Sequence, residues 1–375
     1  MVIVQAFLRW TATARASERA KAAGALGRAY LSATLGREEQ HAAALAMTYL
    51  LDDPSPRVRL ALAEALAGSP EAPRAIILAL AEDQPEISCT VISCSPVITE
   101  TDLIALAGRG DRLIRGFIAA RPQLSRGAAA AIVEIGEEND VTILLENESA
   151  VIGRPTLRRI AERFGQSADI RRLLLDRDLP ADVRHLLVHH VTAALSGSSL
   201  VRATMAAKRI EHVGREAGNA AAVVIAGGVP HEEIPDLVEH LRGAGRLTPA
   251  FLIHALCAGK IDFFAGAIAN LSGLEDRRVR AILATGRMHA VRALLESAGL
   301  GRDIAVVFVD AVFLRRQEEA AETPGSVSAL LLERFRRPGM PASPVSELLD
   351  MVEKLQRAEM RSTARSYADD AYLAA

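Results

Sequence analysis

The sequence predicts an all-α protein in which a helical-repeat solenoid is followed by a packed helical domain. Hydrophobic residues make up 50% of the 375 residues and aromatic residues only 4%, so the core must consist of Ala, Leu, Val and Ile. These side chains suit closely packed helices, because all four are readily buried and Ala and Leu favour the helix. Two further observations support this fold class. A helical pattern recurs several times along the first half of the chain, and several helix starts combine a capping residue with proline.

The clearest helix pair meets around residues 50–59. One helix is expected to end near Leu51 and the next to begin at Pro56, with Ser55 as its N-cap, because proline at the first helical position loses no hydrogen bond. The apolar positions of this second helix follow one stripe: Val58, Ala61, Leu62, Ala65 and Leu66. Gly68 is expected to end it, and residues 69–70 (Ser-Pro) to open the next helix.

The same combination of Leu, Asp and Val recurs along the first half of the chain. Its valine position is expected to be taken in turn by Val58, Ile87, Ile114, Ile152 and Val183. The longest interval separates Ile114 from Ile152, and the others are closely similar. Stacked helix pairs typically repeat with a period of roughly 30 to 45 residues, and this spacing lies near the lower end of that range. The pattern is clearest in the first and fifth units.

Residues 53–66 (DPSPRVRLALAEAL) resemble the second helix of a HEAT repeat, with its Asp and its Val-Arg pair. The order of several short blocks also resembles a bacterial family of HEAT-like proteins classed as a domain of unknown function. These blocks are residues 7–10 (FLRW), 53–66, 72–74 (APR), 95–99 (SPVIT), 247–252 (LTPAFL) and 255–264 (ALCAGKIDFF). The resemblance extends to about Arg315. It implies a helical-repeat fold and a role in binding other molecules, and it implies no catalytic activity.

In HEAT repeats an Asp and an Arg six positions apart form a ladder between neighbouring units. The resemblance therefore implies such roles for Asp53 with Arg59 and for Asp178 with Arg184. The ladder is expected to be interrupted between them, because the fourth unit carries Asn147 in place of the aspartate.

Three segments are expected: residues 1–195 as the HEAT-like solenoid, 196–336 as a helical C-terminal domain, and 337–375 as a linker and C-terminal helix. The second segment should contain helices over residues 200–216, 234–242, 249–258, 263–269, 276–285 and 291–298. Ser343 should cap the last helix, whose apolar seam is Val345, Leu348, Val352 and Leu355. This seam either docks on its own chain or pairs with another, so the oligomeric state stays open.

Charge and cysteine content limit the classes of function. A formal net charge of −2 gives no general positive field for nucleic acid, although 40 of the 44 basic residues are arginine. Three cysteines form no disulfide framework and fit a reducing compartment. No stretch approaches the roughly 20 apolar residues that a membrane span needs. We therefore expect a cytoplasmic protein without a membrane span.

No catalytic or cofactor-binding residue is expected. His185 and His189 share a helical face with Asp182, a geometry that zinc can use, but no third strong ligand is visible. The sequence leaves this metal question open and favours a surface pair of histidines with His190 buried. The acidic run at residues 134–140 is expected to be an exposed turn.

The most economical function is a non-enzymatic scaffold or regulatory adaptor that binds a protein partner of unknown identity. The candidate contacts are arginines near the starts of equivalent helices and two adjacent phenylalanines. A narrow apolar stripe would bury only one of these rings, whereas a multilayered helical domain would bury both. The candidate residues are Arg57, Arg112, Arg115, Arg158, Arg159, Phe263 and Phe264. The alternative is a nucleic-acid-binding solenoid that uses the arginines as a basic edge, which the net charge and the single tryptophan disfavour.

Overall fold

The computed structural model describes residues 2–32, 36–319, 326–337 and 341–373. Every regular element in these ranges is a helix, which confirms the all-α prediction. The chain forms two compact units, Met1–Leu179 (unit 1) and Pro180–Ala375 (unit 2). None of the helices in the described ranges is long and apolar enough to cross a membrane.

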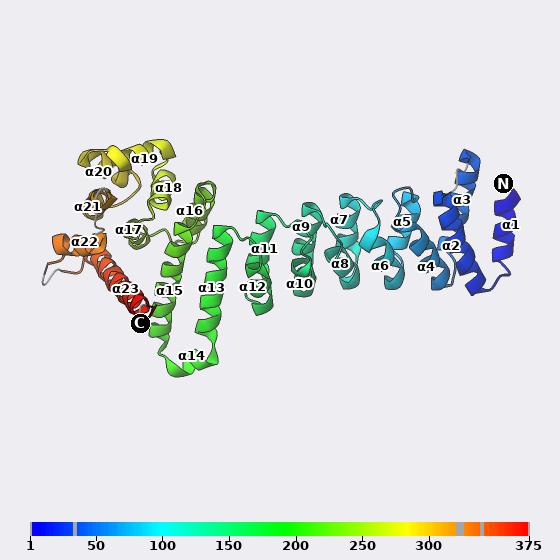
Figure 1. Cartoon of the computed structure of the whole chain (residues 1–375), viewed down its shortest axis with the longest axis horizontal. Coiled ribbons are helices and arrows are strands. Elements are labelled where there is room, and N and C mark those ends of the chain that lie inside the picture. Colours follow the sequence, from blue (N-terminus) through cyan, green and yellow to red (C-terminus); the bar gives the residue numbers. More distant parts are fainter. Residues whose placement is uncertain (1, 33–35, 320–325, 338–340, 374–375) are drawn as a thin grey trace. The chain divides into compact units, whose positions relative to one another are not determined.

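Unit 1 consists of two layers of short helices, visible as two rows in Figure 1. The even layer comprises α2 (Ala16–Ser32), α4 (Pro56–Leu66), α6 (Pro85–Cys94), α8 (Arg112–Ala119), α10 (Glu138–Glu146) and α12 (Ala168–Leu175). The odd layer comprises α1 (Val2–Thr11), α3 (Arg37–Leu51), α5 (Arg74–Ala81), α7 (Glu100–Arg109), α9 (Arg126–Ile135) and α11 (Arg154–Phe164). Each even helix packs on the next even helix. In the odd layer α1 packs on α3, α3 on α5, α7 on α9, and α9 on α11.

The helix boundaries around residue 55 are as predicted, with α3 ending at Leu51 and α4 beginning at Pro56. The next start was predicted wrongly, because α5 begins at Arg74 and not at residues 69–70. A second proline at position 73 explains the delay. Proline disfavours the helical conformation of the residue before it, so the helix can begin only once Pro73 has passed.

Three of the five predicted repeat positions lie on successive even helices, and the last two do not. Val58, Ile87 and Ile114 lie on α4, α6 and α8, but Ile152 lies between α10 and α11 and Val183 lies on a helix of unit 2. The equivalent buried positions in α10 and α12 are Val141 and Ile170. With these two positions the long interval after Ile114 disappears and the spacing becomes nearly constant, so the repeat is more regular than the sequence pattern indicated.

Arginine–aspartate pairs form a ladder that connects α2 with α4, α4 with α6, and α8 with α10. Each arginine donates to a backbone carbonyl at the start of its own helix and to the aspartate at the start of the next even helix. The pairs are Arg19–Asp53 (2.7 Å), Arg59–Asp83 (2.6 Å) and Arg115–Asp140 (2.9 Å). The expected pairing of Arg59 with the Asp53 carboxylate is therefore corrected, since Arg59 takes only the backbone oxygen of Asp53.

A second ladder joins the C-terminal ends of α6, α8, α10 and α12. A donor just after α8, α10 and α12 binds carbonyls at the end of the preceding even helix, groups that a helix cannot satisfy internally. Arg121 donates to the carbonyls of Ile92 and Ser95, and Arg177 donates to those of Leu145 and Asn147. Between them, Asn147 Nδ2 donates to the carbonyls of Ala119 (2.9 Å) and Arg121 (2.7 Å). Asn147 thus connects the end of α10 to the end of α8. This contact differs from the aspartate–arginine pair of the ladder.

We expect Asn147→Asp to destabilise unit 1 by about 1–2 kcal/mol, because a carboxylate cannot donate to the carbonyls of Ala119 and Arg121 and would leave both acceptors unpaired. Urea unfolding followed by circular dichroism measures the change. Asn139→Asp is the matched control, because Asn139 is exposed in the first turn of α10, where a negative charge is tolerated. Equal stability of the two variants would contradict the role given to Asn147.

Unit 2 is a globule of further helices. They are α13 (Ala181–Gly197), α14 (Ser199–Thr204), α15 (Ala207–Gly227), the 3₁₀ helix His231–Glu233, α16 (Ile234–Gly243), α17 (Pro249–Cys257), α18 (Ile261–Ser272), α19 (Asp276–Thr285), α20 (Met288–Ser297), α21 (Arg302–Glu319), α22 (Val327–Phe335) and α23 (Pro344–Leu373). The central helix is α17, which packs against α15, α18, α21 and α23. Six of its nine residues are buried.

Several predicted elements of unit 2 are confirmed. Thr248 caps α17 by accepting from the Phe251 amide at 3.2 Å, and α19 spans residues 276–285. The seam of α23 docks on its own chain, since Leu348, Val352 and Leu355 are buried in the core that α17, α21 and α22 share. The helix expected over residues 200–216 is instead divided into α14 and α15. The Thr204 hydroxyl bonds back to two carbonyls of α14, which competes with continuation of the helix.

Helices α13 and α15 lie side by side and α14 crosses between their ends, as Figure 1 shows. Helix α16 packs against α13 near the start of that helix. The start of α13 is fixed by the buried Glu233 side chain, which accepts from the Ala181 amide at 3.2 Å. This arrangement brings three helices to the walls of one cavity.

Candidate functional site

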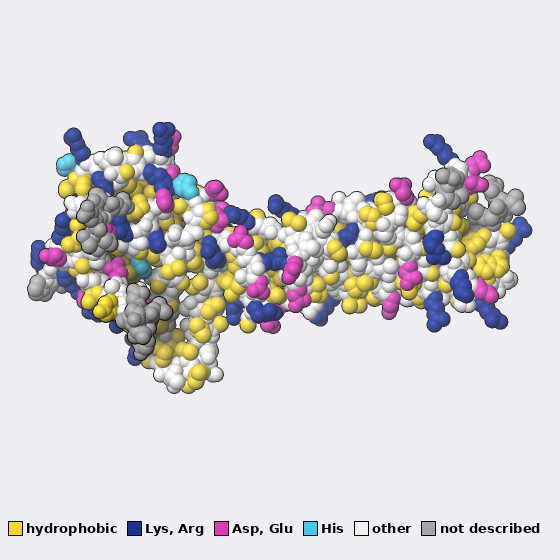
Figure 2. All heavy atoms as spheres, viewed as in Figure 1, with side chains coloured by type: hydrophobic (Ala, Val, Ile, Leu, Met, Phe, Trp, Pro, Cys, Tyr) yellow, Lys and Arg dark blue, Asp and Glu magenta, His cyan; other side chains and the backbone are white. Residues whose placement is uncertain are grey.

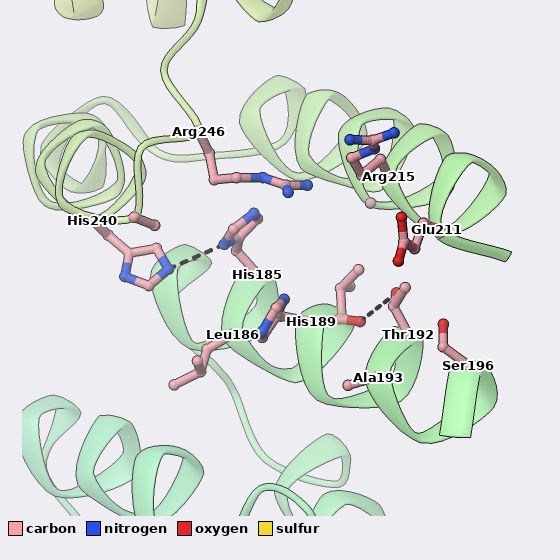
Figure 3. Close-up of a pocket in the computed structure, with 14 residues that line it drawn as sticks. His185, Leu186, His189, Thr192, Ala193, Ser196, Glu211, Arg215, His240 and Arg246 are labelled. Atoms are coloured by element: carbon pink, nitrogen blue, oxygen red, sulfur yellow. Dashed lines mark hydrogen bonds between the residues drawn. The ribbon is translucent and has the colours of Figure 1, made fainter. Parts of the chain in front are cut away.

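A cavity of 580 Å³ lies between α13, α15 and the end of α16 (Figure 3). This volume is in the range of pockets that hold small molecules. Its polar lining consists of His185, His189, Thr192, Ser196, Glu211, Arg215, His240 and Arg246. It is therefore a polar site whose walls come from three different segments of unit 2.

Two histidines form the inner wall of the cavity. His185 Nδ1 and His240 Nε2 lie 3.0 Å apart in a hydrogen bond, with the rings edge to face. One nitrogen must donate and the other must accept, so the two rings cannot both be protonated. The pKa of His185 is lowered to about 4, chiefly by burial and then by the electrostatic effects of His240 and Arg246. His185 is consequently neutral at neutral pH.

Arg246 crosses the cavity next to His185, as Figure 3 shows. Its Nη2 donates to Asn219 Oδ1 at 3.2 Å, a neutral acceptor. A Cβ atom on Gly218 would lie 3.1 Å from this nitrogen, so the glycine gives the guanidinium room against α15. Gly214, one turn earlier, similarly faces Thr192 of α13, where an added Cβ would lie 3.1 Å from the methyl group.

The outer wall carries one acid and one further arginine. Glu211 and Arg215 stand one turn apart on α15 and both are exposed. Glu211 faces Thr192 and Ser196 of α13 across the opening, whereas the Arg215 side chain extends away from them (Figure 3). Among the described residues, neither Arg215 nor Arg246 forms an ion pair with a carboxylate. The cavity thus gathers two guanidinium groups and three imidazoles around a single carboxylate.

The predicted histidine cluster is only partly correct. His189 is exposed as expected, but His185 is buried and pairs with His240 rather than forming a surface pair. The error has a physical cause, because the α16 segment that covers His185 is 55 residues away in the sequence. In the described part of the chain no group of three or more His, Cys, Asp or Glu side chains is placed to hold a metal ion.

The five candidate arginines do not share one edge. Arg57, Arg112 and Arg115 lie on even helices, whereas Arg158 and Arg159 lie on α11 of the odd layer. Arg115 is committed to Asp140, Arg158 pairs with Glu162, and Arg159 pairs with Glu134. On the face shown in Figure 2, basic and acidic side chains are interspersed along unit 1.

The candidate phenylalanines are both in the core, so the alternative in which a multilayered domain buries both is correct and the exposed patch is wrong. Phe263 packs edge to face on Phe251, and Phe264 stacks on Phe308. Their side chains are 1% and 0% exposed, because α18 is covered by α16 on one side and by α17 and α20 on others. Neither ring is available to a partner in this fold.

The residues that sequence reasoning missed are His240, Arg246 and Arg215. Each lies in a different helix or loop from His185, and the sequence carries no signal that joins them. The one local clue is the pair Gly214 and Gly218, because two glycines one turn apart within a helix indicate close approach of a neighbouring group.

A family model described as "Uncharacterised protein conserved in bacteria (DUF2336)" matches residues 87–338. No curated protein and no solved structure matches.

Proposed function

The chain belongs to the bacterial family DUF2336, and from this premise we propose that it is a non-enzymatic protein-interaction scaffold or adaptor. In this proposal unit 1 is a HEAT-like solenoid that presents its odd layer to a protein partner. A solenoid of this kind offers an extended surface, and each repeat contributes contacts rather than chemistry.

The observation that carries the proposal is a set of exposed apolar side chains on the odd helices. Leu45 and Tyr49 stand one turn apart on α3 with 56% and 55% of their surface exposed, and Ile104 on α7 is 38% exposed. Large apolar side chains in water favour association, and aromatic ones are enriched in interface centres. The two ladders between the even helices support the proposal, because they hold the neighbouring odd helices in a fixed order.

The contacts of the arginines favour a protein over nucleic acid. A backbone-binding stripe needs guanidinium groups that are free to meet phosphates. Arg115 and Arg159 are instead held by carboxylates within unit 1. We place the function in the cytoplasm, where reducing conditions suit the free thiols of Cys89, Cys94 and Cys257.

Affinity capture of the tagged protein from its own cells, with and without nuclease, tests this proposal. We expect a specific protein to survive nuclease treatment and to be lost with Leu45→Glu or Tyr49→Glu. Leu113→Glu is the matched control, because Leu113 is 52% exposed but lies on α8 of the even layer. Equal loss with the control would refute the odd-layer surface. Recovery that collapses with nuclease would replace the scaffold by a nucleic-acid binder.

A further inference from the structure

The cavity between α13, α15 and α16 carries a charge pattern that the scaffold proposal does not use. Elsewhere in unit 2, the partly buried Arg280 and Arg315 have carboxylate partners in Asp276 and Glu318, and Arg316 donates to three backbone carbonyls. Arg246 is also partly buried, yet its only described side-chain partner is the neutral amide of Asn219. A cation withdrawn from water without an anion is unfavourable, so this site lacks a negative charge.

The other side chains that line the cavity increase this deficit of negative charge. Arg246 and the ring of His240 lie beside the ring of His185, and His189 lines the same cavity one turn further along α13 (Figure 3). Arg215 lines the cavity from α15, and Glu211 is the only acidic side chain in the lining. A metal cation would meet these charges and be repelled, whereas an anion would offset them.

The donors are also arranged for an oxyanion with several oxygens. Guanidinium groups reach the cavity from α15 and from the segment after α16, and α13 contributes the imidazole of His185. Arginine binds phosphate and carboxylate in the same forked geometry. Donors on three sides suit the tetrahedral phosphate better than the planar carboxylate, and the 580 Å³ volume leaves room beyond the phosphate itself.

We propose that this cavity binds a small phosphorylated molecule, whose phosphate is held by Arg246 and Arg215 beside the His185–His240 pair. Gly218 has a positioning role, because any side chain there would push against the Arg246 guanidinium. This site lies within unit 2, so the proposal stands whether or not unit 1 binds a protein.

Titration of the ¹⁵N-histidine-labelled protein with inorganic phosphate, followed by NMR, tests the proposal. The expected result is a saturable shift of the His185 and His240 signals, assigned from the spectra of His185→Gln and His240→Gln. Acetate and chloride at the same ionic strength are the comparison anions. Arg246→Gln should weaken phosphate binding about tenfold or more, as expected for loss of a charge-assisted hydrogen bond. Arg209→Gln is the matched control, because Arg209 is exposed on α15 outside the cavity lining.

Gly218→Ala provides a variant that keeps every charge. It should weaken binding severalfold, because the added methyl group displaces a flexible guanidinium without disturbing backbone packing. Circular dichroism verifies that each variant is folded. The proposal fails if phosphate gives no saturable shift, if Arg209→Gln weakens binding as much as Arg246→Gln, or if acetate binds as tightly as phosphate.

Discussion

Asp140→Ala is expected to destabilise unit 1 by about 3–5 kcal/mol, the cost of removing one partner from a buried ion pair. The Asp140 side chain is fully buried, and its Oδ2 accepts from Arg115 Nε at 2.9 Å and from the Glu137 amide at 3.0 Å. Without it, Arg115 keeps only the Gly110 carbonyl. Because Asp140 Oδ1 is buried without a hydrogen-bond partner, its removal also relieves a cost, and the lower end of the range is expected.

Chemical unfolding measures the size of this effect, and hydrogen exchange locates it. Amides of α8 and α10 should lose protection, while those of unit 2 should keep it. Arg158→Ala is the control, because its pair with Glu162 is exposed and should contribute less than about 1 kcal/mol. The double change Arg115→Met with Asp140→Leu should recover much of the stability, since replacing both partners leaves no buried charge. An unchanged Asp140→Ala protein would show that the ladder is not a source of stability.

The same aspartate shows why part of the fold was predictable and part was not. Helix starts depend on neighbouring residues, so Pro56 and Thr248 identified α4 and α17 correctly. Asp140 also stands at a helix start and looks like a member of an exposed acidic turn. Its burial depends on Arg115, 25 residues earlier in the sequence, and local patterns carry no information on such a contact.

Phe263 and Phe264 illustrate a second limit. On an isolated helix two adjacent rings point to different sides, so an amphipathic helix exposes one of them. Helix α18 is surrounded by neighbours on several sides, and both rings find apolar partners. Amphipathic reasoning therefore applies to the two-layered unit 1 better than to unit 2, where a central helix such as α17 has almost no polar face.

The candidate site was the least predictable part. Its four most informative side chains are His185 on α13, Arg215 on α15, His240 on α16, and Arg246 in the segment after α16. The sequence identified His185 and its helical neighbours as the place to look. It gave no sign that α16 and the segment after it cover His185. It therefore favoured an exposed pair of histidines where the structure has a buried pair.

Unit 2 is expected to lose stability as the pH falls from about 6.5 to about 4. Burial lowers the pKa of both His185 and His254 to about 4, well below the value of about 6.5 for an exposed histidine. Between these values the unfolded chain binds a proton at each ring and the folded chain does not. Stability therefore rises with pH through this window, is fully present above it, and is lost on acidification. The expected loss is on the order of 2–3 kcal/mol per ring at pH 4.

Calorimetry between pH 7 and pH 4.5 in phosphate-free buffer measures this dependence, with hydrogen exchange in α13 and α17 to assign the transition to unit 2. His185→Gln and His254→Leu should each reduce the slope of stability against pH, because neither new side chain takes up a proton. His289→Gln is the matched control, since His289 is exposed on α20 and should keep the wild-type slope. Paired carboxylates such as Asp102 give a slope of the same sign in unit 1, so only the difference between variants identifies the histidines. A wild-type slope in both histidine variants would mean that these rings bind as many protons in the folded chain as in the unfolded chain, and would contradict the effect of burial on them.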